Sequence, residues 1–213
     1  MTKPSVSNYI FKTRLYRSSA YDELRIKMES LLSPHRFAHV KNVAKTAVRL
    51  AQIYGADMDK AYIAGMLHDC AKYLDDDQML DAAKEYKIEL EEVEKQSLQL
   101  VHAKVGAVFA KEIYGIEDED ILNAIRYHTT GRPEMSILEK IIYVADYIEP
   151  GRKRMVDDVE AAKMLELARS YATLDLDYAL KYILKETYDY LINKTDYAIS
   201  DMTKKAYEYY KDM

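Results

Sequence analysis

Apolar residues recur along most of the chain at spacings of three and four, which is the pattern of amphipathic helices. The clearest stretch follows Ser33 and Pro34, which favour a helix start, and stops at Gly55, which favours a helix end. Further helices are expected near residues 19–32, 57–68, 75–83, 102–113, 121–128, 136–149 and 176–191. No stretch alternates as a strand does, so the pattern predicts an all-α fold, a single helical bundle.

Composition supports this fold class and sets its size. The 213 residues include only six glycines and four prolines, and 49% of them are apolar. We expect residues 1–18 to form a basic N-terminal extension and residues 19–213 to form one helical domain that includes the C-terminal helices. No apolar stretch has the length of a membrane helix or the features of a signal peptide, which predicts a cytoplasmic protein without membrane contact.

Charge and cysteine usage restrict the chemistry. The net charge of −5 argues against stable binding to nucleic acid, and the single cysteine, Cys70, excludes a thiolate zinc site. Any metal would therefore be held by nitrogen and oxygen ligands.

Four histidines lie on or beside apolar helix faces, where a lone histidine is most often a hydrogen-bonded core residue. Here they occur together with the inward-facing carboxylates Asp69 and Asp146. Burying several such groups is costly unless a cation neutralises them, so the set indicates a metal centre. The expected ligands are His39, His68, Asp69, His102, His128 and Asp146.

The chain contains four motifs: Arg36–Val40 (RFAHV), Leu67–Lys72 (LHDCAK), His128–Gly131 (HTTG) and Asp146–Arg152 (DYIEPGR). They resemble those of the HD superfamily, and specifically its bacterial symmetrical bis(5′-nucleosyl)-tetraphosphatases, and the resemblance covers about residues 30–195. It implies an HD-domain helical bundle with a two-metal centre. One metal would take His39, His68, Asp69 and Asp146, and the second would take His102, His128 and the other oxygen of Asp69. Such sites commonly hold iron, with manganese or another transition metal as alternatives.

The resemblance further implies hydrolysis of diadenosine tetraphosphate into two ADP, by attack of a metal-bridging hydroxide on phosphorus. Asp69 and Lys72 are then the expected catalytic residues. The Lys72 ammonium lies one helical turn beyond Asp69 and suits a phosphate oxygen, although without the motif it would read as a solvated surface lysine. The expected substrate-binding residues are Lys72, Thr129, Thr130, Gly131 and Arg152.

Three other functions remain open from the sequence. They are a broader nucleotide or phosphomonoester hydrolase of the same superfamily, an HD-type di-iron oxygenase, and a nucleotide-sensing module without turnover. The basic side chains of Lys72 and Arg152 count against the oxygenase, and the complete ligand set counts against the sensor. Apolar positions in the first helix and in the tyrosine-rich tail suggest a homodimer.

Five further features are left outside the expected site. Arg36 would support Asp69 or a substrate phosphate or pair with a surface carboxylate. Glu149 would accept a hydrogen bond behind a ligand, orient Arg152 or form a helix-end ion pair. We expect Cys70 to be a small buried hydrophobe, His35 to be exposed and Glu89–Glu94 to be a solvated acidic helix face.

Overall fold

The computed structural model describes residues 17–152, 159–194 and 199–213, so most of the expected N-terminal extension lies outside it. Within these ranges it contains helices and no strand, which confirms the all-α prediction. None of the described helices has the length and apolarity that a membrane crossing requires. The elements are α2 (Arg17–Leu31), α3 (Pro34–Tyr54), α4 (Met58–Leu67), α5 (Asp76–Glu85), α6 (Glu92–Gln96), the 3-10 turn η1 (Leu98–Leu100), α7 (His102–Glu112), α8 (Glu119–Arg126), α9 (Ile137–Ile148), α10 (Val159–Leu174), α11 (Leu176–Lys194) and α12 (Asp201–Tyr210).

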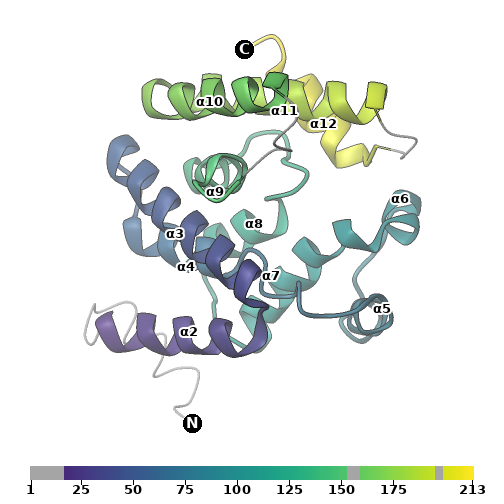
Figure 1. The fold of residues 1–213 in the computed structure, drawn as a ribbon. Coiled ribbons are helices and arrows are strands. Elements are labelled where there is room, and N and C mark those ends of the chain that lie inside the picture. The colour runs from purple at the N-terminus through teal and green to yellow at the C-terminus, as the bar shows by residue number, and fades with distance from the viewer. Residues whose placement is uncertain (1–16, 153–158, 195–198) are drawn as a thin grey trace.

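Helix α9 lies in the middle of the bundle (Figure 1). On one side it contacts α3, α4 and α8, and on the other it contacts α10 and α11, with α12 beside α11. Helix α2 crosses α3 and α4 at the far end, and α5 and α6 lie to one side, near α7 and η1. The bundle therefore has a central helix enclosed by two groups of helices.

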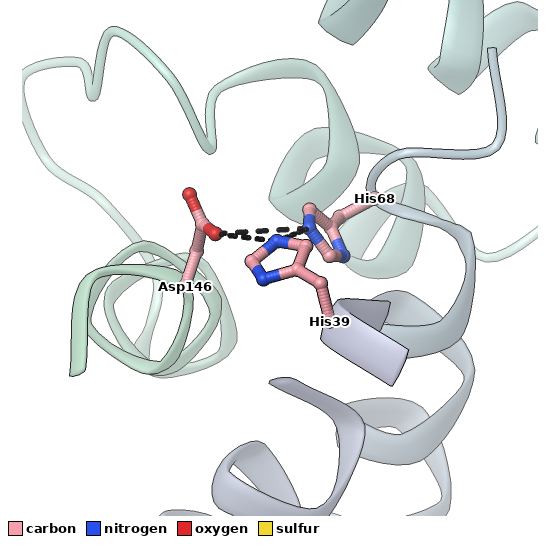
Figure 2. A group of neighbouring side chains, drawn as sticks. All are labelled: His39, His68 and Asp146. Atoms are coloured by element: carbon pink, nitrogen blue, oxygen red, sulfur yellow. Dashed lines mark hydrogen bonds and ion pairs between the residues drawn. The ribbon is translucent and has the colours of Figure 1, made fainter. Parts of the chain in front are cut away.

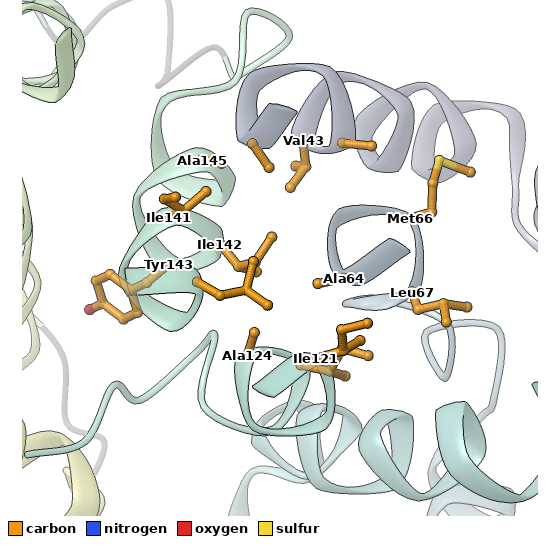
Figure 3. Close-up of a cluster of buried hydrophobic side chains, with 14 of the residues drawn as sticks. Val43, Ala64, Met66, Leu67, Ile121, Ala124, Ile141, Ile142, Tyr143 and Ala145 are labelled. Carbon is orange, nitrogen blue, oxygen red and sulfur yellow. The ribbon is translucent and has the colours of Figure 1, made fainter. Parts of the chain in front are cut away.

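The hydrophobic core around α9 determines how the ends of the surrounding helices are positioned relative to one another. Ile141 and Ile142 are fully buried and lie in a cluster with Val43 of α3, Ala64 of α4 and Ala124 of α8 (Figure 3). Full burial of a large aliphatic side chain contributes about 1.5–3 kcal/mol, so this cluster holds the four helices firmly together.

Helices α3 and α4 approach at backbone contact. A Cβ atom on Gly65 would lie 2.6 Å from the Cα of Ala44, a separation that real Cβ atoms do not show. Only glycine allows this approach, and it brings the C-terminal part of α4 against the middle of α3.

The helix termini follow the predicted signals where these were clear. The Ser33 hydroxyl accepts a hydrogen bond from the Arg36 amide, Gly55 adopts a left-handed conformation with φ of 70°, and Asp57 caps α4. The first described helix starts at Arg17 rather than Ser19. Helix α10 was not predicted at all.

The expectation for Glu89–Glu94 was wrong for part of that segment. Glu94 is only 2% exposed, and its carboxylate accepts hydrogen bonds from the Lys104 ammonium at 2.7 Å and the Glu91 amide at 2.8 Å. Helix α6 is thus anchored to α7 by a partly buried ion pair at Glu94, whereas Glu89 and Glu92 are exposed as expected.

Candidate metal centre

Six polar side chains, carried by helix ends that the core brings together, meet at one place. Five of them are buried and the sixth is mostly buried. They are His39 in α3, His68 and Asp69 after α4, His102 at the start of α7, His128 after α8 and Asp146 in the last turn of α9. These are the six ligands that the sequence analysis expected.

One cluster contains His39, His68 and Asp146, and Figure 2 shows the carboxylate of α9 pointing at both imidazoles. The Asp146 Oδ1 atom lies 3.0 Å from the Nε2 of His39 and 3.8 Å from the Nε2 of His68. The two Nε2 atoms are 3.3 Å apart. Three ligand atoms thus converge on one point.

A second cluster contains His102 and His128, whose Nε2 atoms lie 3.1 Å apart. Asp69 Oδ1 is 3.1 Å from the Nε2 of His102 and 3.6 Å from that of His128.

Asp69 joins the two clusters. Its other oxygen, Oδ2, lies 3.7 Å from the Nε2 of His39 and 3.6 Å from that of His68. One carboxylate therefore directs one oxygen to each pair of histidines, which is the arrangement of a ligand shared between two cations.

The hydrogen bonds of the imidazoles show what these clusters are suited to hold. The Nδ1 atoms of His68, His102 and His128 lie against the carbonyls of Gly65, Gln99 and Ile125, and the Nδ1 of His39 lies 3.2 Å from Glu149 Oε1. An Nδ1–H that donates to such an acceptor leaves the Nε2 lone pair facing inward. Two lone pairs at 3.1 or 3.3 Å repel each other unless a cation lies between them, so the donor set fits a divalent metal.

Ionisation favours the same interpretation. Burial lowers the pKa of His68 to about 4 and also lowers the pKa of His102, so both imidazoles are neutral near pH 7. Although burial raises the pKa of the Asp69 carboxyl, the surrounding imidazoles hold it well below its usual range. Burial acts against ionisation of Asp146 too, yet His39 and Arg152 lower its pKa strongly. Neutral imidazoles and ionised carboxylates are the forms that bind metals.

The sequence model of the HD domain matches residues 36–151, a range that contains all six of these residues. This chain belongs to the HD-domain family.

Relatives at moderate identity place the chain more narrowly within that family. It is 43% identical over 170 residues to the symmetrical bis(5′-nucleosyl)-tetraphosphatase of Halalkalibacterium halodurans, covering 80% of this chain and 86% of that protein. The protein of the same name from Bacillus subtilis is 41% identical, with 80% and 87% covered. The HD domain therefore groups with the symmetrical bis(5′-nucleosyl)-tetraphosphatases, as the motifs predicted.

A solved structure supports the fold of this HD domain. The crystal structure of a predicted HD superfamily hydrolase involved in NAD metabolism from Clostridium acetobutylicum superposes with a TM-score of 0.81 at 40% identity. The alignment covers 90% of this chain and 97% of the other.

Glu149 has a role behind the ligands that the sequence analysis left undecided. It is 2% exposed, one carboxylate oxygen faces His39 and the other accepts from the Gly151 amide. It therefore lies behind His39, one of the expected ligands, and the two side chains form an ion pair when the imidazole is protonated.

Arg169, which lies in α10 and outside the matched HD segment, was not predicted to contribute to the site. Its guanidinium donates to the carbonyl oxygens of Ile148 at 3.0 Å and Glu149 at 2.9 Å. This contact holds the end of α9, from which Asp146 and Glu149 extend. No local motif marks the residue, since its partners are backbone atoms 20 and 21 positions away.

Three cationic side chains surround the centre. Arg36 Nη1 lies 2.8 Å from Asp69 Oδ2, and Arg152 Nη2 lies 2.6 Å from Asp146 Oδ1. Lys72 is half-buried, and burial lowers the pKa of its ammonium. The HD domain thus has a positive rim, although the chain as a whole is acidic.

The three residues after His128 lie in different surroundings. Thr129 and Thr130 line a pocket, whereas Gly131 is buried with φ of 65°. A Cβ on Gly131 would lie 3.3 Å from the Ala206 side chain. The structure thus gives this glycine a turn and packing role, and its predicted contact with substrate stays a prediction.

Two expectations about neighbouring residues are confirmed. Cys70 is completely buried with its thiol against the Gly106 carbonyl, and burial raises its pKa, so it is not a reactive nucleophile. His35 is exposed.

Proposed function

We propose that this chain hydrolyses diadenosine tetraphosphate symmetrically into two ADP. The observation that carries the proposal is Asp69, whose two oxygens face two separate pairs of histidines. A centre for two cations is suited to phosphoryl transfer, and the relatives with this activity cover most of the chain.

The metals of the proposal are two divalent ions, with iron as the first choice and manganese as the second. His39, His68, Asp146 and one oxygen of Asp69 would hold one ion, and His102, His128 and the other oxygen of Asp69 would hold its neighbour. When bound, such a pair lowers the pKa of coordinated water and neutralises charge on phosphoryl oxygens. Asp69 contributes by fixing both sites relative to each other.

The chain's own cations position the polyphosphate. Lys72 and Arg152 border the centre and carry charges that match phosphate oxygens, with the planar guanidinium suited to a forked contact. Arg36 holds Asp69 in orientation through its 2.8 Å contact. The Thr129 hydroxyl follows His128 directly and has no hydrogen-bond partner among the described residues, so it is available to the substrate. The Thr130 hydroxyl donates to the Gly131 carbonyl at 2.9 Å, so a contact with the substrate would have to replace that bond.

Product analysis tests the proposed reaction. Protein reconstituted anaerobically with iron, and separately with manganese, is incubated with diadenosine tetraphosphate and the products are resolved by ion exchange. ADP as sole product supports symmetrical cleavage, whereas AMP with ATP would show asymmetric cleavage and contradict it. Release of phosphate from many nucleotides would favour the broader hydrolase, and cleavage that never occurs with both metals bound would favour the sensor or the oxygenase.

Lys72→Ala tests the catalytic assignment of the lysine. We expect kcat to fall by about 100-fold, because one cation that neutralises the transferring phosphoryl group is lost, while metal content stays near that of the wild type. Elemental analysis and steady-state kinetics measure both quantities. Lys84→Ala, at an exposed position of α5, is the control and is expected to behave as wild type. Loss of metal in the Lys72 variant would contradict its role.

The predicted homodimer is part of this proposal. Ile26 in α2 is 57% exposed and Met213 is 68% exposed, which leaves apolar surface on the first helix and on the tail. Light scattering distinguishes a mass of 24.7 kDa from twice that value.

A further inference from the structure

A pocket of about 430 Å³ lies between the segment that follows α5, α6, η1, α7, the end of α8 and α12. Its volume falls in the range of roughly 300–1,000 Å³ that is usual for small-molecule sites. We propose that it binds one nucleoside end of the polyphosphate substrate, an inference that rests on the proposed function.

The two segments that carry the second pair of histidines also contribute residues to the lining of the pocket. Leu100 and Lys104 line it and lie two residues before and after His102. Tyr127 and Thr129 also line it and directly flank His128, with consecutive Cα atoms about 3.8 Å apart. Both helix ends that carry these histidines therefore also form pocket wall.

The wall has the surface that a purine ring requires. Tyr86, Leu100, Val108, Tyr127 and Met202 all line the pocket and are half-buried, so each presents apolar or aromatic surface to it. Flat aromatic and aliphatic walls bind nucleobases by stacking and by burial of the ring faces.

Two kinds of polar group complete the pocket. The Thr129 hydroxyl oxygen is shielded from solvent and has no hydrogen-bond partner among the described residues, and such a group is costly without a ligand or water. Lys87 and Arg126 are exposed lining residues that have no acidic partner in the described part of the chain. Glu89, Glu91 and Glu94 also line the pocket, and Glu94 is paired with Lys104. The two cations without an acidic partner are the lining groups that could contact the phosphate chain of a bound nucleotide.

The pocket is held open by contacts that do not involve the metal ligands. Glu94 in α6 binds Lys104 of α7, and the same ammonium donates to the Glu89 carbonyl at 3.1 Å. Glu91 accepts from the Asp201 amide at 2.9 Å, which joins α12 to the same wall. The cavity is thus preformed, which lowers the entropic cost of binding.

Symmetrical cleavage agrees with this placement. Two phosphate groups separate each nucleoside from the central bond, so a cleaved bond at the metal centre leaves a nucleoside a short distance to either side. The pocket occupies the side of His102 and His128, so it receives one of the two adenosines.

Filling the pocket tests the proposal. Val108 lines it from the outer face of α7, and Val108→Trp would occupy the space of the base. Binding of diadenosine tetraphosphate with a methylene in place of the central bridging oxygen is measured by calorimetry on manganese-loaded protein. We expect Kd to rise by about tenfold or more, equivalent to about 1.4 kcal/mol, with metal content unchanged. Ile113→Trp, at a 44% exposed position beyond the end of the same helix, is the matched control and is expected to leave Kd unchanged.

Two further measurements keep the outcome clear. Met202→Trp fills the pocket from α12 and replaces the first variant if that variant does not fold, as judged by circular dichroism. Inorganic tetraphosphate, which has no nucleoside, is expected to bind the filled variants as it binds the wild type. Wild-type affinity for the methylene analogue in both filled variants would overturn the proposal, and so would an equal loss of tetraphosphate binding, which would indicate a phosphate site instead.

Failure of the pocket and failure of the proposed function give different results. If the wild type produces ADP and the filled variants cleave with unchanged KM, only the nucleoside assignment is wrong. If the wild type produces no ADP, the proposed function itself is wrong.

Discussion

The two groups of side chains on either side of Asp69 differ in their number of carboxylates and in the groups that orient their imidazoles. On one side His39 and His68 share the space with a second carboxylate, Asp146, and Arg36 and Arg152 lie against these acids. On the other side the Nε2 atoms of His102 and His128 face the shared Oδ1 of Asp69, and His68 lies close to Asp69 and His128 as well. The sides also differ in how imidazoles are oriented, since His39 depends on the side chain of Glu149 whereas His102 and His128 depend on backbone carbonyls.

This difference predicts unequal metal sites. A hard divalent cation is bound more tightly by two carboxylates and two imidazoles than by one shared carboxylate oxygen and two imidazoles. We therefore expect the His39 side to bind metal more tightly and the His102 side to lose it first. The His39 side is also the one whose orientation can be changed by substituting a side chain outside the ligand set.

Asp69→Ala is expected to have the largest effect, because it removes the one ligand that both sides use. Loss of a partner behind a ligand already costs about 10–100-fold in metal affinity or activity, so loss of the shared ligand is expected to exceed about 100-fold in kcat/KM. Elemental analysis should show that bound metal falls on both sides. Asp76→Ala, at an exposed position in the first turn of α5, controls for loss of a carboxylate. Retention of two metals per chain in Asp69→Ala would refute its bridging role.

His102→Ala should separate the two sides. The variant keeps all ligands of the His39 side, so we expect about one metal per chain in place of two, together with loss of most activity. Asp146→Ala removes a carboxylate from the His39 side, which is expected to bind metal more tightly. At limiting metal concentration it should therefore lower the total bound metal more than His102→Ala does. If His102→Ala lost both ions equally, the two sides would not bind metal independently. The expected difference in affinity between them would then be contradicted.

Glu149→Gln changes orientation without removing a ligand. The amide still offers one oxygen to the Nδ1–H of His39, but its NH2 group cannot accept from the Gly151 amide as the carboxylate does. We expect metal affinity on the His39 side to fall by about 10–100-fold, measured by competition with a chelating dye. Glu92→Gln, on the exposed face of α6, serves as control. Unchanged affinity would show that His39 is held without Glu149.

The cluster of histidines and carboxylates, and the helices that carry it, could be predicted from the sequence for a physical reason. Histidines that interrupt apolar faces at helical spacing must point inward, and Asp146 shares a face with Leu138 and Ile142. Local signals such as Ser33 before Pro34 also act within one turn, so they are visible in a single segment.

Features that depend on contacts between distant segments could not be predicted in this way. Glu94 looked solvated within an acidic run, yet Lys104 neutralises it in the folded chain. The division of Asp69 into two faces and the pocket beside Thr129 arise only when several helix ends meet. Arg169 was missed for the same reason, because it binds carbonyl oxygens that carry no sequence signal.

Arg169→Met should have the smallest effect on the centre and a measurable one on stability. The guanidinium holds two carbonyls at the end of α9, and its loss leaves them without this charged donor. We expect the free energy of unfolding to fall by about 1.5–3 kcal/mol, measured in urea on metal-free protein so that bound metal does not mask the change. Metal affinity should fall by less than in Glu149→Gln, because Asp146 and Glu149 are still present but less firmly positioned. Arg49→Met, at an exposed position of α3, is the control. If the variant had a wild-type free energy of unfolding and wild-type metal affinity, α10 would not be needed to position the end of α9. Glu149 would then be the most distant side chain on which the metal affinity of the His39 side depends.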